Sequence, residues 1–426
     1  MKISFRQGGL RKLPRLLAIM LVVAYSINYA PVTQAGATFK IDDTKWASVG
    51  AGLRTSFEAR EDAAGTPGNS QWSNDFALDN IRLYLNAQIH KYIKLEFNTD
   101  CQTCSNGGEM RILDAIGKIE YNPYINLWMG RMLVPAERRE MNGPFYSAIY
   151  NIFASGTPFE SADYNLVIKS DGTSAGSFGR DDGATFWGAA FDGRLQYAFG
   201  FFRGLRGGAN VDDNILYAQR VAYNFWEVEK NPGYYTSGTY YGKGGDILTL
   251  GVSNQYQEDG AGTDFDPGNF RGTAVDILLE KVLPNDGVIT FNGEYKNYGI
   301  SNGFSQATRD AIKTLNGDSD PTNNIDPGFT MFEGNAYDFS GMYLFPDKVW
   351  IGQFQPYVRY TNIAPSTSSN REAYEGGVNY IIDGHNAKVS LSWTYGDLLT
   401  KGLIDFSSNV PGDHVNAVKL GFQLQI

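Results

Sequence analysis

Apolar and polar residues alternate along many short stretches of this chain. In residues 78–90 every second position is apolar, namely Ile81, Leu83, Leu85, Ala87 and Ile89. The positions between them are polar or amphipathic, namely Asn80, Arg82, Tyr84, Asn86 and Gln88. A period of two residues places the two sets on opposite faces of a β-strand. The pattern therefore predicts an all-β protein.

The same alternation predicts about sixteen strands. They cover residues 46–60, 78–89, 92–99, 110–121, 125–134, 184–191, 194–203, 214–228, 246–256, 270–282, 287–299, 334–345, 348–362, 371–382, 385–397 and 413–426. In the last of them the apolar set runs to the C-terminal Ile426, and an alternating apolar end suits a barrel-insertion signal.

The connections between these strands alternate between tight and long. The tight ones are His90-Lys91, Asn122-Pro123, Asp192-Gly193, 284–286, Pro346-Asp347 and Asp383-Gly384. The long ones are residues 61–77, 100–109, 135–183, 204–213, 257–269, 300–333, 363–370 and 398–412. Short turns at one end and long loops at the other are typical of outer-membrane barrels. Residues 229–245 break the alternation, because they are long on the short side; either that turn is extended or a hairpin has been missed.

The predicted fold is a transmembrane antiparallel β-barrel of about sixteen strands, formed by residues 36–426 as one domain. A soluble β-sandwich would show the same period of two, but it gives no reason for the alternating connections. In the barrel, the apolar face of each strand meets lipid. The polar face, which repeatedly carries Lys, Arg and Glu in mid-strand, lines a lumen.

Residues 135–183 form the longest connection and are the main candidate for a functional element. Pro135 ends the preceding strand because it has no N–H to donate to a ladder. The sequence AERREM follows, and then come four aromatic residues: Phe145, Tyr146, Tyr150 and Phe153. A connection this long is usually functional or disordered, and this one is too aromatic to be disordered. We expect a third extracellular loop that folds into the lumen and constricts the pore. Its aromatic residues either pack within the loop or guide sugars.

The N-terminus has the order of a secretory signal peptide. Five basic residues, from Lys2 to Arg15, precede the apolar run LLAIMLVVA and a small-residue cleavage site at Ala35. The apolar run is too short for a membrane anchor, which needs about 20 residues. We expect residues 1–35 to direct export. The mature barrel then lies in the outer membrane of a Gram-negative bacterium, in contact with outer-membrane lipid.

Composition narrows the possible partners. The 36 basic residues include the five of the N-terminus, where no acidic residue occurs. The mature chain therefore has 31 basic against 46 acidic residues and a net charge near −15. This balance argues against nucleic acid as a partner. A mean hydropathy of −0.31 is too polar for a helical membrane protein.

The two cysteines, Cys101 and Cys104, form a single C-x-x-C pair. In an oxidising compartment the simplest interpretation is a loop disulfide. A zinc site needs about four ligands, and the histidines His90, His385 and His414 are all distant from the pair. We therefore expect no metal and no cofactor. The histidines also show no Ser/His/Asp spacing, so we do not expect an enzyme.

Three segments resemble the phosphate-selective porin family, porins O and P. SNDFALDNIRLYLNAQIHKYIKLEFNTD is similar to the family's opening hairpin, and RILDAIGKIEY is similar to its fourth strand. MGRMLVPAERRE is similar to the segment that leads into the family's constriction loop, although Leu133 stands where a basic residue is common. The resemblance implies a homotrimer of sixteen-stranded channels, with phosphate as a solute.

An anion path needs cations along a low-dielectric constriction. Guanidinium groups suit phosphate and carboxylate because their donors form a planar fork. The candidate pore-lining residues are Arg82, Arg131, Arg138, Arg139, Glu140 and Arg359. Alternatively, Arg138 and Arg139 pair with the glutamates that flank them and only hold the loop. In the same way, Arg82 and Arg359 could pair with lumen acids such as Asp114.

These observations predict an outer-membrane porin that allows passive diffusion of small hydrophilic solutes or ions. Selectivity for anions, phosphate among them, is the finer expectation. The alternative is the barrel sleeve of a porin–cytochrome electron conduit, since C-x-x-C occurs in some such barrels. The sequence has no haem motif C-x-x-C-H, because Ser105 follows Cys104, and the long loop would obstruct a sleeve.

Overall fold

The computed structural model describes residues 36–64, 71–101, 104, 109–152, 165–168, 174–206, 209–263, 266–301, 334–365, 370–398 and 414–426. The predicted signal peptide, residues 1–35, lies outside this part of the chain, and so do Phe153 and most of the predicted long loops. Among the described residues, no helix is long and apolar enough to cross a membrane.

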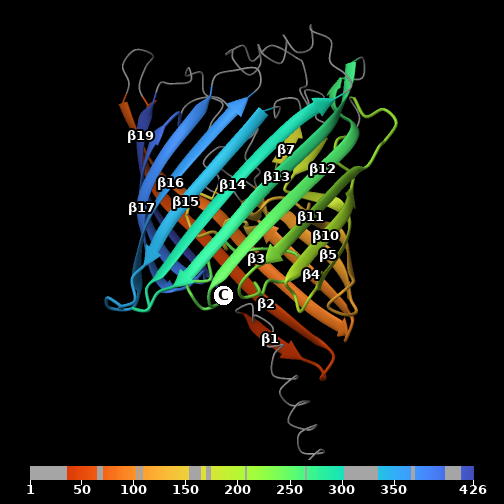
Figure 1. Ribbon diagram of the computed structural model, residues 1–426, viewed down its shortest axis with the longest axis horizontal. Coiled ribbons are helices and arrows are strands. Elements are labelled where there is room, and N and C mark those ends of the chain that lie inside the picture. Colours follow the sequence, from red (N-terminus) through yellow and green to blue (C-terminus); the bar gives the residue numbers. More distant parts are fainter. Residues whose placement is uncertain are drawn as a thin grey trace, which may run out of the picture. The chain divides into compact units, whose positions relative to one another are not determined.

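Seventeen strands form one antiparallel sheet, and sixteen of them close into a barrel (Figure 1). The barrel strands are β2 (Trp46–Ala64), β3 (Gln71–His90), β4 (Ile93–Asp100), β5 (Arg111–Glu120), β6 (Asn126–Leu133), β9 (Arg180–Ala190), β10 (Leu195–Phe202), β11 (Leu216–Asn224), β12 (Ile247–Thr263), β13 (Asp266–Val282), β14 (Val288–Ser301), β15 (Gly334–Leu344), β16 (Gln353–Pro365), β17 (Arg371–Asp383), β18 (Ala387–Gly396) and β19 (Val415–Gln425). Each strand pairs with the next, β6 pairs with β9, and β19 closes the ring on β2. The fold predicted from the alternation is confirmed.

In the part of the chain that the structure describes, four further elements lie outside this ring. β1 (Ala37–Lys40) pairs with the start of β2. The short helix α2 (Arg138–Asn142) and the two-stranded sheet of β7 (Asn165–Ile168) and β8 (Ser174–Phe178) interrupt the connection between β6 and β9. The sequence pattern indicated none of them, because each is too short to show a period.

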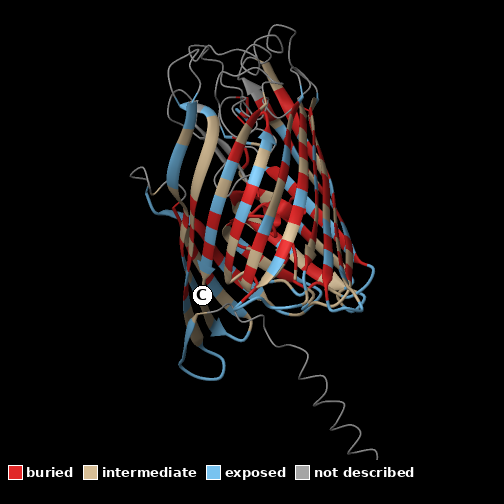
Figure 2. Ribbon diagram, turned by 90° about the vertical axis from the view of Figure 1, so that its left-hand side faces the viewer, coloured by how far each residue is buried: buried red, intermediate tan, exposed pale blue. Residues whose placement is uncertain are grey.

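The two faces of the barrel wall carry opposite residue types. On β14, Thr290, Glu294 and Lys296 are buried, whereas Ile289 and Phe291 are exposed. Figure 2 shows this alternation of buried and exposed residues along the strands. A soluble sheet would bury its apolar face. Here the charged face is buried inside the ring, so the apolar face requires lipid.

The shorter connections lie at one end of the barrel, as predicted. The one between β15 and β16 is longer than the predicted turn Pro346-Asp347, because it spans residues 345–352. Exposed aromatic residues gather in and beside these connections: Tyr121, Tyr124, Phe191, Phe225, Trp226, Phe345 and Trp350. Aromatic belts of this kind mark the membrane–water interface. Residues 225–246, between β11 and β12, form an extended connection at this end and contain no strand. The long connection is therefore an extended turn, and not a hairpin that the sequence pattern missed.

Two predicted connections were too long. β12 and β13 run on to Thr263 and Asp266, so residues 257–269 form most of a hairpin rather than a loop. β3 likewise begins at Gln71 and takes up part of the predicted loop 61–77. Neither extension shows a regular alternation of apolar and polar residues, so periodicity could not find them.

Candidate functional site

Residues 135–152 are the described first part of the predicted constriction loop, and they are almost entirely buried. They leave the end of β6 at Pro135 and form α2 within a few residues. Gly143 ends the helix with a φ of 60°, a conformation that suits glycine, and Pro144 cannot continue the helical hydrogen bonds. The segment Asn-Gly-Pro thus gives α2 a sharp end.

The backbone of this segment is tied to strands on nearly opposite sides of the ring. Its carbonyl groups accept hydrogen bonds from buried side chains of the barrel wall. These bonds join Pro135 to Gln255 (3.2 Å), Ala136 to Arg220 (3.0 Å), Phe145 to Gln423 (2.9 Å), Ser147 to Lys388 (2.7 Å) and Ala148 to Asn379 (2.9 Å). The donors belong to β11 and β12 at the start of the segment and to β17, β18 and β19 further along it. The wall therefore fixes the course of the segment.

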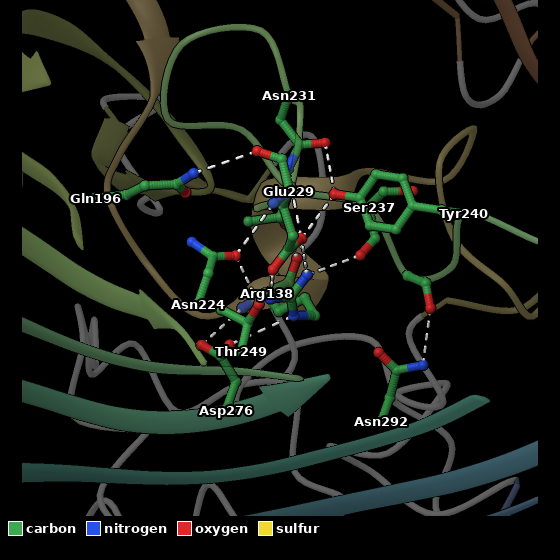
Figure 3. Close-up of polar contacts among 12 residues, drawn as sticks. Arg138, Gln196, Asn224, Glu229, Asn231, Ser237, Tyr240, Thr249, Asp276 and Asn292 are labelled. Carbon is green, nitrogen blue, oxygen red and sulfur yellow. Dashed lines mark hydrogen bonds and ion pairs between the residues drawn. The ribbon is translucent and has the colours of Figure 1, made fainter. Parts of the chain in front are cut away.

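Arg138 lies at the centre of a buried ion cluster (Figure 3). Its guanidinium group donates to both carboxylate oxygens of Glu229, at 2.8 and 2.7 Å, and to the carbonyl of Ser237 at 2.9 Å. Asp276 lies 3.5 Å from the Nε atom of Arg138 and also binds Arg220. Burial lowers the pKa of Arg138, but Glu229 and Asp276 outweigh it and raise the pKa above its usual value. This guanidinium is charged and is paired with two carboxylates.

Arg139, the next residue, pairs with acids on two other strands. It contacts Glu294 on β14 at 2.7 Å and Asp338 on β15 at 3.1 Å. Glu137, just before the helix, binds Lys296 at 2.5 Å. Glu137, Arg138 and Arg139 thus each pair with residues of other segments. Pairing that fixes the segment was foreseen from the sequence, but its partners were not.

Arg359 on β16 binds the far end of the segment. Its guanidinium donates to Asp338 at 2.7 Å, to the carbonyl of Ile152 at 2.8 Å and to the carbonyl of Asn151. Glu375 on β17 lies 3.7 Å away. Asp338 therefore joins Arg359 to Arg139, so that one buried carboxylate couples the wall to the helix.

The other three predicted pore residues occupy different settings. Arg82 on β3 is buried and pairs with Asp100 at 2.8 Å. Arg131 on β6 is partly exposed and lies 3.5 Å from Asp182. Glu140 is buried within α2. The structure thus brings Arg138, Arg139 and Glu140 together and keeps Arg82 and Arg131 apart from them.

The aromatic residues of the segment pack against the wall. The ring of Phe145 lies 4.9 Å from the guanidinium of Arg82. Tyr150 donates to Asp79 at 2.6 Å, and its ring lies where a Cβ atom on Gly421 would come within 2.6 Å. Contacts this close favour packing over a path for sugars.

A cavity of about 110 Å³ remains beside Asn151. The charged residues that line it, from β2, β16, β17 and β19, are Glu58, Arg60, Arg359, Glu375 and Lys419. Lys419 binds Glu58 at 2.7 Å, and both side chains stay partly exposed. Sequence reasoning did not single out Arg60 or Lys419. Both occupy polar positions of predicted strands, so the alternation that selected Arg359 could have found them.

Sequence reasoning also did not select residues 225–246 as a functional element, although their length was an exception to the pattern of short and long connections. Glu229, Ser237 and Thr239 of this connection are buried. The connection meets the segment 135–152 directly, through Arg138 and Glu229. Its length was the only signal in the sequence.

Comparisons with known proteins support the fold. No protein-family model matches the sequence, and no match is found among curated proteins. Among solved structures, an anion-selective porin from Comamonas acidovorans has a TM-score of 0.52 at 10% identity, over 90% of this chain and 100% of that chain. OmpT of Vibrio cholerae has a TM-score of 0.49 at 12% identity, over 92% and 100% of the two chains. The first similarity shows a shared outer-membrane barrel fold and nothing finer, and we draw no inference from the second.

Proposed function

We propose that this chain is an outer-membrane channel through which small hydrophilic solutes or ions diffuse passively. The observation that carries the proposal is the course of residues 135–152, which bond to wall strands on nearly opposite sides of a closed ring. A segment tied in this way crosses the lumen and narrows it. The predicted loop 135–183 is then the constriction of the pore, with its described part held by ion pairs.

The permeation path in this proposal passes the cavity beside Asn151. Arg60, Arg359 and Lys419 line it together with Glu58 and Glu375, three basic side chains against two acidic ones. A small excess of positive charge in a narrow, low-dielectric passage favours anions weakly. The solved neighbour from Comamonas acidovorans is described as anion-selective. We propose the same weak preference here, for anions in general rather than for phosphate in particular.

The predicted pore-lining arginines divide into two roles. Arg359 faces the cavity, whereas Arg138 and Arg139 are each paired with two wall or turn carboxylates. Arg359 is also paired, with Asp338 and Glu375, but it lines the cavity, and Arg138 and Arg139 do not. Arg138 and Arg139 therefore hold the constriction, with Glu140 beside them, and Arg82 supports its aromatic end.

Other expectations from the sequence belong to the same proposal. Residues 1–35 direct export, the barrel lies in the outer membrane of a Gram-negative bacterium, and three copies assemble as a homotrimer. The electron-conduit alternative is less well supported, because a sleeve needs an open lumen. Here residues 135–152 and 225–246 pack against each other on the buried side of the wall.

Conductance measurement tests the proposal. Purified protein should insert into planar lipid bilayers and give stepwise current increments, and a KCl gradient should give a reversal potential on the anion side. Replacing chloride by phosphate should reduce the current without a saturable block. A heat-modifiable barrel that produces no channels, or recovery of the chain as a soluble monomer, would overturn it.

A further inference from the structure

The connection of residues 225–246 differs from the others at its end of the barrel. The connection between β15 and β16, at the same end, leaves Trp350 86% exposed. In residues 225–246, by contrast, Glu229 and Ser237 are each 4% exposed and Thr239 is fully buried. A turn that only joined two strands would have no reason to bury these polar residues. The connection therefore folds back against the inner side of the wall.

An aromatic cluster holds one side of this connection to the wall. Trp128 on β6 is fully buried, and its ring lies 5.3 Å from the ring of Tyr234 and 5.5 Å from that of Tyr235. Gly233 precedes the two tyrosines with a φ of 59°, and a Cβ atom there would come within 2.3 Å of the Trp128 ring. Only glycine permits both this backbone conformation and this close approach.

A single buried carboxylate holds the other side. Glu280 on β13 accepts hydrogen bonds from the hydroxyl of Thr239 at 2.7 Å, from the backbone of Tyr240 at 3.0 Å and from the backbone of Gly242 at 2.8 Å. Three donors on one carboxylate fix the backbone of the turn at that point.

The innermost part of the connection binds the segment 135–152. Glu229 forms two hydrogen bonds with Arg138, and the hydroxyl of Tyr240 supports Glu229 at 2.6 Å (Figure 3). Thr236 donates to the carbonyl of Arg138 at 2.9 Å, and the backbone of Gly238 donates to the carbonyl of Tyr146 at 2.9 Å. The two segments enter from opposite ends of the barrel and bond to each other.

We propose that residues 225–246 form a second constriction element, which enters from the short-turn end and positions Arg138 and α2. This inference rests on the proposed channel function and deepens it. In it, the pore is narrowed by two segments bound to each other, and Glu229 is the residue that positions Arg138 between them. The size of the pore then depends on a turn that the sequence marks only by its length.

Shortening the turn is the main test. Pairing of β11 with β12 continues to Glu227 and Asp246, where the backbone N–H of Glu227 donates to the carbonyl of Asp246 at 2.9 Å. Replacing residues 228–245 by Asn-Gly should therefore close a two-residue hairpin without disturbing the ring. We expect conductance in planar bilayers to rise by about twofold or more, because a wider passage carries more ions.

The matched control shortens an exposed connection at the same end. Replacing residues 347–351 by Asn-Gly should leave conductance unchanged, and both variants should keep the gel shift between unheated and heated samples. If the wild type gives no channels, the proposed function fails. If the wild type conducts and the shortened turn conducts no better, the inference fails and the function stands.

A charge variant tests the same idea without changing the length. Glu229→Gln removes a negative charge beside Arg138, so the reversal potential in a KCl gradient should shift toward anions. Glu227→Gln is the control, because Glu227 belongs to the same connection but is exposed. A shift in Glu229→Gln alone supports a positioning role in the pore. Equal shifts in both variants, or none in either, would overturn it.

Discussion

Two regions inside the barrel are built from the same kinds of residue and differ in how completely those residues are paired. In the first, which we call the filled sector, Trp128, Arg138 and Asp276 are all buried. Trp128 and Arg138 contact residues 225–246, and Asp276 contacts Arg138. In the second, the open sector, charged residues line the cavity beside Asn151. Arg359 is buried there and paired with Asp338 and Glu375, but Lys419 pairs with Glu58 and both of these side chains remain partly exposed.

The difference separates a structural charge from a functional one. The field of a buried guanidinium that contacts two carboxylates is largely cancelled nearby. A lysine with one partly exposed carboxylate keeps part of its hydration and can exchange partners. The residue type does not decide the role, since arginines occur in both sectors. The number and burial of the partners decide it.

The largest effect should come from breaking the filled sector at Arg138. Arg138→Ala leaves the carboxylates of Glu229 and Asp276 buried with fewer partners, which costs about 3–5 kcal/mol. We expect the temperature of the gel-mobility shift to fall and conductance to rise as the segment 135–152 loosens. Arg131→Ala is the control, because Arg131 is partly exposed and lies 3.5 Å from Asp182. Equal stability of the two variants would contradict the structural role of Arg138.

The sequence predicted the strands of the barrel wall far better than the segments that fold inside the barrel. Each wall strand repeats one rule, apolar outside and polar inside, so β14 and β16 could be found from period two alone. The partners of Arg138 obey no such rule. Glu229 lies 91 positions from Arg138 in the sequence, and Asp276 lies on β13. Their meeting depends on the closed ring and on an inward-folded turn, and neither leaves a local pattern.

For the same reason, the sequence identified charged residues but not their roles. Arg138 and Arg139 stood out because they lie in a proline-started, charged stretch, and the structure uses them as anchors. Arg60 and Lys419 attracted no attention, because a lone charge on a polar strand face is common. Their importance comes from the cavity, which forms where β2 closes against β19.

The second-largest effect should be a dependence of stability on pH. It arises at His385, in the turn between β17 and β18, where this turn contacts residues 225–246. Burial, with Lys388 nearby, lowers the pKa of His385 to about 3, and its Nε2 atom lies 2.9 Å from the carbonyl of Thr239. The unfolded chain binds this proton at its ordinary pKa of 6.5, so the folded state loses stability as pH falls from 6.5 toward about 3.

Thermal gel shifts measured across this range should therefore show a steeper loss of stability in the wild type than in His385→Gln, which cannot take up the proton. The comparison isolates one buried imidazole from the many acids that also titrate. Parallel pH profiles for the two proteins would show that His385 does not couple the turn to the filled sector.

A smaller effect should come from the open sector. Replacing Arg60 and Lys419 with Gln removes two of the three basic side chains at the cavity, so the reversal potential in a KCl gradient should move toward cations. The fold should survive, because both residues are only partly buried. Arg138→Ala should move the reversal potential less than this double variant does. A larger shift in Arg138→Ala would show that the roles assigned to the two sectors are reversed.

The smallest effect is expected at the disulfide between Cys101 and Cys104. Cys101 directly follows Asp100, the partner of Arg82, so a loose loop here could in principle reach the constriction. The backbone of Cys101 is held independently of its sulfur, because it exchanges hydrogen bonds of 3.1 and 3.2 Å with Ile81. Replacing both cysteines with Ser should therefore leave conductance and selectivity unchanged in planar bilayers. A large change would show that this loop shapes the pore through the pair of Arg82 and Asp100.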